Sequence, residues 1–255
     1  MPAVLSHPLH AVDAGVRWIL TQVAMVTAAL FVYFRVRGLT AGTPEIAQTH
    51  ARDLMALERA TGLDIEAGLQ RVLVHWDWLV APANWVYIYG HWPVIVPTLV
   101  WLAARHRDRF VRLRDAMMIS GGIGLFIFAL YPVAPPRLAS LGIVDTVSEQ
   151  SLAYRVLQPP AFVNQYAAMP SLHAGWDLLV GLAIAGAAGH LWLRLAGYLL
   201  PVLMVAAVIL TGNHYLLDVV AGLALALIGL WAADALDRRR PGHARPPVPT
   251  PGSAR

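Results

Sequence analysis

Long apolar runs constrain this chain more than any other feature of its sequence. About 20 consecutive apolar residues are needed to cross the hydrocarbon core of a bilayer. Six runs in the 255-residue chain come close to that length. They lie at about residues 18–34, 82–103, 116–134, 171–189, 191–211 and 213–233. The sequence therefore predicts an all-α, polytopic membrane protein with six transmembrane helices.

The composition agrees with this fold class and excludes several kinds of chemistry. Charged residues make up 13% of the chain, whereas soluble proteins carry about 25%. The chain contains neither cysteine nor lysine, which excludes disulfides, thiolate metal sites, cysteine nucleophiles and lysine Schiff bases. We expect the net charge of +4 to mark one membrane face, with no nucleic-acid partner.

The distribution of the arginines predicts the orientation of the chain. With the N-terminus inside, twelve of the 19 arginines fall in cytoplasmic segments and seven in the longer outer segments. Such a bias follows the positive-inside rule. We therefore expect a multi-pass protein of the plasma membrane with both termini in the cytoplasm.

Two segments outside the predicted spans carry signals of their own. After the first span, Thr43-Pro44-Glu45 predicts the start of a helix and Gly62 its end, and Asp64 is suited to cap another helix. We expect these short helices to lie on the outer membrane surface, with a plain connector as the alternative. Residues 239–255 are rich in Pro, Arg and Gly, which predicts a disordered cytoplasmic tail after a single membrane domain of residues 1–238.

Polar residues at the helix ends point to a site on the outer face. An ionisable group at mid-bilayer costs roughly 2.5–3.5 kcal/mol, so these residues need a reason beyond packing. The helices at 171–189 and 213–233 both open on the outer side, where the chain also emerges from the helix at 116–134. This face would hold Arg137, Ser171, His173, Asn213 and His214.

The spacing of histidine and aspartate predicts how these residues act. His214 and Asp218 are one helical turn apart, so the carboxylate can hold one imidazole N–H and leave the other nitrogen free as nucleophile or base. His173 and Asp177 share this spacing, and there we expect the carboxylate to keep the imidazole protonated. Two helix N-termini would add attraction for an anion. The set indicates a phosphoryl site; polar packing clusters and the ion pathway of a transporter are the alternatives.

At these residues the sequence resembles the type 2 phosphatidic acid phosphatase superfamily. Residues 168–173 (AMPSLH) and 212–218 (GNHYLLD) resemble its second and third signatures. Residues 131–138 (YPVAPPRL) resemble the first signature as found in the inositolphosphotransferase branch, which includes fungal inositol phosphorylceramide synthase. The resemblance covers about residues 82–235.

The resemblance implies a six-helix, metal-independent enzyme whose site faces away from the cytosol. It assigns His214 as the nucleophile that forms a phosphohistidine, Asp218 as the residue that orients it, and His173 as the general acid. Ser171 and Arg137 would hold phosphate oxygens. Water or an alcohol would then accept the phosphoryl group, and no cofactor is expected.

Three places depart from the superfamily signatures. Leu130 stands where the first signature has lysine, Leu172 where the second has glycine, and residues 207–208 (AV) where the third has Ser-Arg. The change at Leu172 suits the inositolphosphotransferase branch, but the other two remove two cations from the phosphate clamp. Arg155 in the long outer loop is a candidate replacement for one of them.

Several further residues are candidates for contacts with the head group. They are His91 in the second predicted helix, Asn213 beside the nucleophile, and Asn164, Gln165 and Tyr166 in the outer loop. For His91 the favoured alternative is a buried histidine bonded to a carbonyl. The predicted site is His173, His214 and Asp218 for catalysis, with Arg137, Arg155, Ser171, Asp177, His91 and Asn213 for the substrate and its phosphate.

We interpret the chain as a lipid phosphoesterase or phosphotransferase that acts on a lipid phosphate or phospholipid, with transfer of a head group such as phosphoinositol favoured. A simple phosphatidate or polyprenyl phosphate phosphatase is the close alternative. More distant alternatives are a transporter, a pseudoenzyme with a reduced clamp, and a zinc-dependent intramembrane hydrolase. The last would use His173, His214 and Asp218 as metal ligands.

Overall fold

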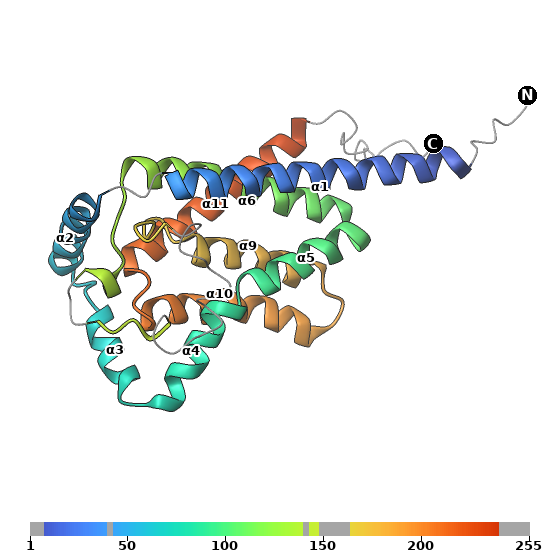
Figure 1. Cartoon of the computed structure of the whole chain (residues 1–255). Helices are drawn as coiled ribbons and strands as arrows, with labels where there is room; N and C mark the ends of the chain where they lie inside the picture. Colours follow the sequence, from blue (N-terminus) through green and yellow to red (C-terminus); the bar gives the residue numbers. More distant parts are fainter. Residues whose placement is uncertain (1–7, 40–42, 140–142, 148–163, 240–255) are drawn as a thin grey trace, which may run out of the picture.

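The computed structural model describes residues 8–39, 43–139, 143–147 and 164–239, and helices dominate these ranges (Figure 1). Within them no strand forms, and a single parallel bridge joins Val133 to Ala167. The predicted tail beyond residue 239 and the candidate Arg155 lie outside the described residues. The helices are α1 (Pro8–Leu39), α2 (Pro44–Thr61), α3 (Glu66–Val74), α4 (Asp77–Tyr89), α5 (Trp92–Arg105), α6 (Arg107–Leu130), η1 (Pro136–Leu138), α9 (Leu172–Ala187), α10 (Leu191–Leu210) and α11 (Leu216–Arg239).

Several of these helices are apolar, which indicates a membrane protein. Four are long and apolar enough to cross a bilayer: α6, α10, α11 and the segment Gly15–Val36 of α1. Helices α4 and α5 together make a fifth candidate. The run predicted at 171–189 forms the 16-residue α9, which is shorter than the other candidates. The described helices therefore give four or five spans and do not confirm six.

The second predicted span is wrong as a continuous helix. The helix is interrupted between Tyr89 and Trp92, and α4 and α5 are bent by 42° relative to each other there. Pro93 lies in the first turn of α5, where its ring would clash with the carbonyl of Tyr89 if one helix continued through both. The break places His91 at the start of α5, inside the protein.

Helix α9 lies at the centre of the bundle, in contact with α5, α6, α10 and α11 (Figure 1). Its contact with α11 depends on a small residue, because a Cβ added at Gly222 would collide with the carbonyl oxygen of Ser171. The two backbones therefore touch where α9 begins. This approach brings the start of α9 beside the loop that precedes α11.

Helices α2 and α3 form at the predicted positions. Gly62 ends α2 in the left-handed conformation, at φ +73°, as is common for a glycine after a helix. One face of α2 is buried against the segments before η1, α9 and α11. The contacts join Ala47, Ala51 and Leu54 to Val133, Ala134, Ala168 and Tyr215. Helix α2 is therefore packed into the fold next to the segments that carry the predicted site. A plain connector would not be packed in this way.

Candidate active site

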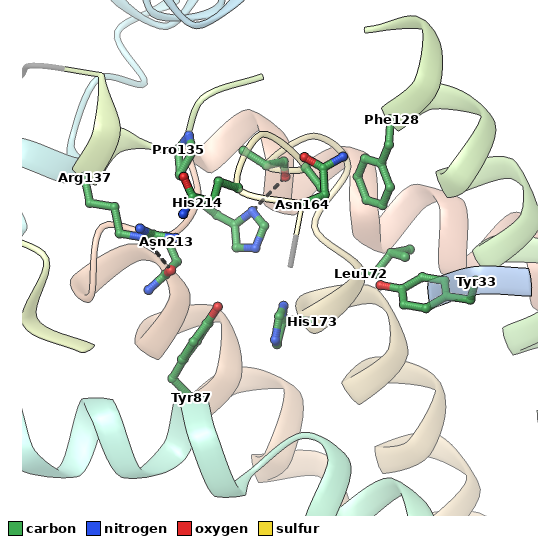
Figure 2. A pocket seen from close by; sticks show the side chains of 13 residues that line it. Tyr33, Tyr87, Phe128, Pro135, Arg137, Asn164, Leu172, His173, Asn213 and His214 are labelled. Atoms are coloured by element: carbon green, nitrogen blue, oxygen red, sulfur yellow. Dashed lines mark hydrogen bonds between the residues drawn. The ribbon is translucent and has the colours of Figure 1, made fainter. Parts of the chain in front are cut away.

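One cavity gathers most of the predicted site residues (Figure 2). Its walls come from α1, α4, α6, η1 and α9 and from the loops before α9 and α11. The lining residues are Tyr33, Tyr87, Phe128, Pro135, Arg137, Asn164, Gln165, Ala167, Ala168, Leu172, His173, Asn213 and His214. Arg137, His173, Asn213 and His214, predicted to share one face, thus share one pocket.

His214 lies in the loop before α11, two residues ahead of the helix, and not within its first turn as we expected. Its Nδ1 is 2.8 Å from the carbonyl oxygen of Ala168 and 3.5 Å from Oδ2 of Asp218. Both neighbours are acceptors, so in the neutral ring Nδ1 carries the proton and Nε2 has the free lone pair. The imidazole projects into the pocket on the side of His173 (Figure 2). The predicted free nitrogen is thus available, although a carbonyl oxygen is closer to Nδ1 than the expected carboxylate.

Asp218 is fully buried and holds the backbone of the same turn. Its Oδ2 accepts a hydrogen bond of 2.9 Å from the N–H of Tyr215, while its Oδ1 has no hydrogen-bond partner. The carboxylate therefore supports His214 in two ways, by facing Nδ1 and by fixing the residue that follows.

The N-terminus of α11 is not open to an anion, which corrects the expectation that both helix starts attract the phosphate. The three consecutive N–H groups of residues 215–217 donate to the carboxylates of Asp218, Glu66 and Glu58. Neither glutamate was a candidate from the sequence. A phosphate in the pocket is therefore not held by this helix end.

Ser171 also differs from its expected role. It is fully buried, caps α9 by accepting a 3.4 Å hydrogen bond from the N–H of Ala174, and is not among the residues that line the pocket. Serine is a favoured N-cap because its oxygen satisfies an N–H that the helix leaves unpaired. Its hydroxyl thus organises the start of α9, the turn that carries His173.

His173 faces His214 across the pocket, with 5.9 Å between the ring centroids. The ring stacks on Tyr87 of α4 at 4.8 Å and lies 4.3 Å from the ring of His91. These neighbours come from both sides of the α4–α5 break. The broken helix therefore shapes the surroundings of the predicted general acid.

Asp177 has a different partner from the one predicted. Its Oδ1 lies 2.9 Å from Nδ1 of His91, and both side chains are buried. We expected the i, i+4 neighbour His173 to bond this carboxylate. The α4–α5 break brings His91 against α9 instead. The His91–Asp177 pair therefore lies next to His173.

Arg137 is anchored at the wall of the pocket. Its Nε donates to Oδ1 of Asn213 at 2.9 Å, and a terminal nitrogen donates to Asp145 at 3.0 Å. The backbone N–H of Arg137 donates to the carbonyl of Gly212 at 3.0 Å, and Gly212 has a φ of +69° that favours glycine. Two of the five guanidinium N–H groups are used in the side-chain bonds, which leaves three for an anion.

No charged side chain replaces the missing superfamily cations at residues 130, 207 and 208, and none of these three residues lines the pocket. Leu130 ends α6 with 66% of its surface exposed, and Ala207 and Val208 are packed in the core beside Tyr87. Arg137 is the sole arginine among the described residues that line the cavity.

Several lining residues were missed in the sequence. Tyr33, Tyr87 and Phe128 lie in apolar helices, where aromatic residues are usual core residues, and only their tertiary contacts distinguish them. Asn164 and Gln165, considered as weak candidates, do line the pocket, whereas Tyr166 does not.

Comparison with known proteins gives a family match for most of the chain. The model described as PAP2 superfamily matches residues 52–232. The match begins in α2, well before residue 82 where we expected the family-like region to start. Neither a curated protein nor a solved structure matches the chain.

Proposed function

The chain belongs to the PAP2 superfamily, and from this premise we propose that it transfers or hydrolyses the phosphorylated head group of a lipid through a phosphohistidine at His214. Membership in the superfamily supports lipid phosphatase or phosphotransferase chemistry in an enzyme. The observation that carries the finer proposal is the state of His214, whose Nδ1 is held by protein acceptors while its ring enters the pocket opposite His173.

The proposed reaction has two displacements at phosphorus. In the first, Nε2 of His214 bonds to phosphorus while the bond from phosphorus to the leaving oxygen breaks, and His173 gives its proton to that oxygen. In the second, His173 takes a proton from water or an alcohol, whose oxygen displaces Nε2. Proton transfer by a positioned group of this kind contributes roughly 10²–10⁴-fold to the rate.

Arg137 and Asn213 are the proposed ligands of the phosphoryl oxygens. The guanidinium is held by Asn213 and Asp145, so it is oriented before the substrate arrives. Such preorganised donors stabilise the charge that develops in the transition state. The buried Ser171 is not assigned to this task.

His91 and Asp177 are proposed as positioning residues beneath His173. Replacing Asp177 by Asn, or His91 by Asn, should lower kcat about tenfold, by analogy with the rate contributed by a positioned acid, while KM changes less than threefold. Because the two side chains bond each other, the double variant should be no worse than either single variant. Steady-state kinetics of the three proteins would measure this. Effects that multiply in the double variant would contradict a shared role.

The motif resemblance favours transfer of a phosphoinositol-like head group, with a simple lipid-phosphate phosphatase as the alternative. The test is the purified protein in detergent with phosphatidate, polyprenyl phosphate and phosphatidylinositol, each with and without an alcohol acceptor. Release of free phosphate indicates a phosphatase, and transferred head group indicates a transferase. An acid-labile phosphoenzyme mapped to His214 supports the proposal, and turnover with no such adduct under quenching contradicts it.

Metal independence is part of the proposal and has its own arm of that test. Among the described residues, no three or more His, Cys, Asp or Glu side chains are grouped to hold a metal ion. Nδ1 of His214 is also engaged with the carbonyl oxygen of Ala168 at 2.8 Å, so this nitrogen is not free to bind a metal. Turnover should persist after chelation and dialysis. Loss of turnover that zinc restores would favour the metal hydrolase instead.

The transporter alternative gains one feature from the fold, because broken helices are common near transporter substrate sites. Here the break places His91 against Asp177 and His173. Catalytic turnover of any lipid in the panel decides between the two.

We propose six spans, with α9 and the bent α4–α5 pair counted among them, and a site on the extracytoplasmic side. The cysteine-free chain allows single-cysteine labelling in intact cells. A membrane-impermeant maleimide should label Gln48→Cys in α2 without permeabilisation, and His190→Cys, before α10, only after it. Both side chains are exposed. The reverse pattern would place the site in the cytoplasm.

A further inference from the structure

Two glutamates outside the proposed reaction are buried against the start of the helix that follows the nucleophile. Glu58 lies in α2 and Glu66 in α3, and they are only 1% and 3% exposed. Carboxylates are seldom buried so fully unless they have partners. Their shared partner is the N-terminus of α11.

The contacts join each glutamate to a different N–H group of that terminus. An oxygen of Glu66 accepts from the N–H of Leu216 at 2.7 Å, and an oxygen of Glu58 accepts from the N–H of Leu217 at 2.8 Å. The first N–H groups of a helix have no partner within it, and they form its positive end. Acidic groups from two other helices thus hold α11 in place by its first turn.

This turn is continuous with the nucleophile. The backbone N–H groups of Asn213 and His214 both donate to the carbonyl of Val208, at 3.0 and 3.1 Å. The loop is therefore tied to the end of α10 on one side of His214 and to the two glutamates on the other. Its backbone has little freedom to move the imidazole away from the pocket.

The glutamates also line a second cavity, which His214 does not line. Arg59, Asp64 and Tyr215 share its wall with them. The hydroxyl of Tyr215 is buried there without a hydrogen-bond partner. The glutamates therefore act on His214 through the backbone, because neither lines the pocket that the imidazole enters.

We propose that Glu58 and Glu66 are positioning residues that fix the loop of His214 from outside the active site. The inference rests on the proposed function of His214, and it extends the machinery to α2 and α3. It gives these helices a role in turnover, although none of their residues lines the active-site pocket.

The same arrangement makes the clamp sensitive to alkaline pH. Burial is the largest cause that raises the pKa of Glu58 to about 8; the hydrogen bond from Leu217 lowers it, and the charges of Glu66 and Asp218 raise it further. As the pH rises through about 8, Glu58 gains a negative charge close to the carboxyl groups of Glu66 and Asp218. The groups facing Glu58 are Glu66 from α3, Asp218 and Tyr215 from the start of α11, and Arg59 and Asp64 at the cavity.

The direction of the stability change follows from the sign of this shift. A carboxyl group whose pKa is raised by folding binds more protons in the folded state than in the unfolded state, between its ordinary value of 4.5 and about 8. The stability that it contributes is present below pH 4.5 and is lost as the pH rises through about 8. We therefore expect thermal stability to fall between about pH 4.5 and 8 and to level off above it, kcat to fall as the pH rises through about 8, and Glu58→Gln to flatten both curves.

The test compares Glu66→Ala with Glu66→Gln, which keeps an acceptor oxygen, and uses Glu45→Ala on the exposed start of α2 as the control. Glu66→Ala should lower kcat at least tenfold with KM within threefold. Glu66→Gln should recover at least a third of the wild-type kcat, and the control should match wild type. Equal losses for Ala and Gln, or no loss for Ala, would overturn the clamp. If the alanine variant does not fold, the flattened pH profile of Glu58→Gln decides.

A second readout does not depend on turnover. The rate at which diethyl pyrocarbonate modifies His214, followed by peptide mass spectrometry, should change at least threefold in Glu66→Ala and less than twofold in Glu66→Gln. An unchanged rate in both would overturn the clamp. If the wild-type protein turns over no lipid but these rates separate as expected, the proposed function fails while the positioning of His214 stands.

Discussion

Replacing His214 by alanine should lower turnover of the lipid substrate by roughly 10⁴-fold or more, the scale seen when a covalent nucleophile is removed. Alanine has no nitrogen to form the bond to phosphorus. Among the described residues, no other side chain places a nucleophile at the position of the His214 imidazole. The acid-labile phosphoenzyme should disappear with the activity. KM is not expected to explain the loss, because Arg137 and Asn213 remain to bind the phosphate.

The measurement uses a lipid that the wild-type protein turns over, with phosphate release and head-group transfer scored separately. His190→Ala, a change of an exposed histidine before α10, is the matched control and should retain full activity. Unfolding is checked by the melting temperature, since His214 is largely buried. Turnover within tenfold of wild type in a folded His214→Ala protein would refute the phosphohistidine mechanism.

Replacing Arg137 by alanine should give the second largest effect, a fall in kcat/KM of roughly 10²–10³-fold, as for the loss of a preorganised donor to a transition-state oxyanion. We expect this arginine to bear more of the phosphate clamp than the superfamily pattern assigns it, because Leu130, Ala207 and Val208 offer no charge. Arg137→Lys should recover only part of the loss, since an ammonium keeps the charge but cannot reproduce the fork of N–H groups that binds two oxygens.

The exposed Arg52 of α2 supplies the control for Arg137, and Arg52→Ala should leave kcat/KM unchanged. Asp145→Asn is informative because it removes the ion pair and keeps the arginine. It should raise KM more than it lowers kcat, because the guanidinium is held less firmly while its charge remains. Wild-type kinetics for Arg137→Ala would show that another cation holds the phosphate. Arg155, outside the described residues, would then be the first candidate.

The predictable parts of the site are those in which the interacting residues are close together in the sequence. The His214–Asp218 spacing does place Oδ2 3.5 Å from Nδ1, and the caps of α2 lie where Thr43 and Gly62 predict them. The same local reasoning failed for Asp177, because its partner lies 86 residues away in a helix that was predicted to be unbroken. Local spacing shows which groups can meet, but it does not exclude a better-placed group from elsewhere in the chain.

The start of α11 shows the same limit. From the sequence it is a helix N-terminus with N–H groups free for a phosphate. In the fold those groups are taken by Glu58 and Glu66, which lie 159 and 150 residues from their partners. Nothing in the pattern of α2 or α3 marks these glutamates apart from other polar residues of an amphipathic helix.

The sequence by itself predicted the apolar helices, the signature residues and the presence of two histidines and an arginine at one site. These follow from run length, residue type and short spacing, which are local properties of the chain. The tertiary structure alone decided which acceptor holds each imidazole, that Ser171 serves as a helix cap, and that buried glutamates hold the start of α11. Those outcomes depend on tertiary packing, because buried polar groups lose their water and need another hydrogen-bond partner. That partner is whichever group the packed helices bring within hydrogen-bond distance.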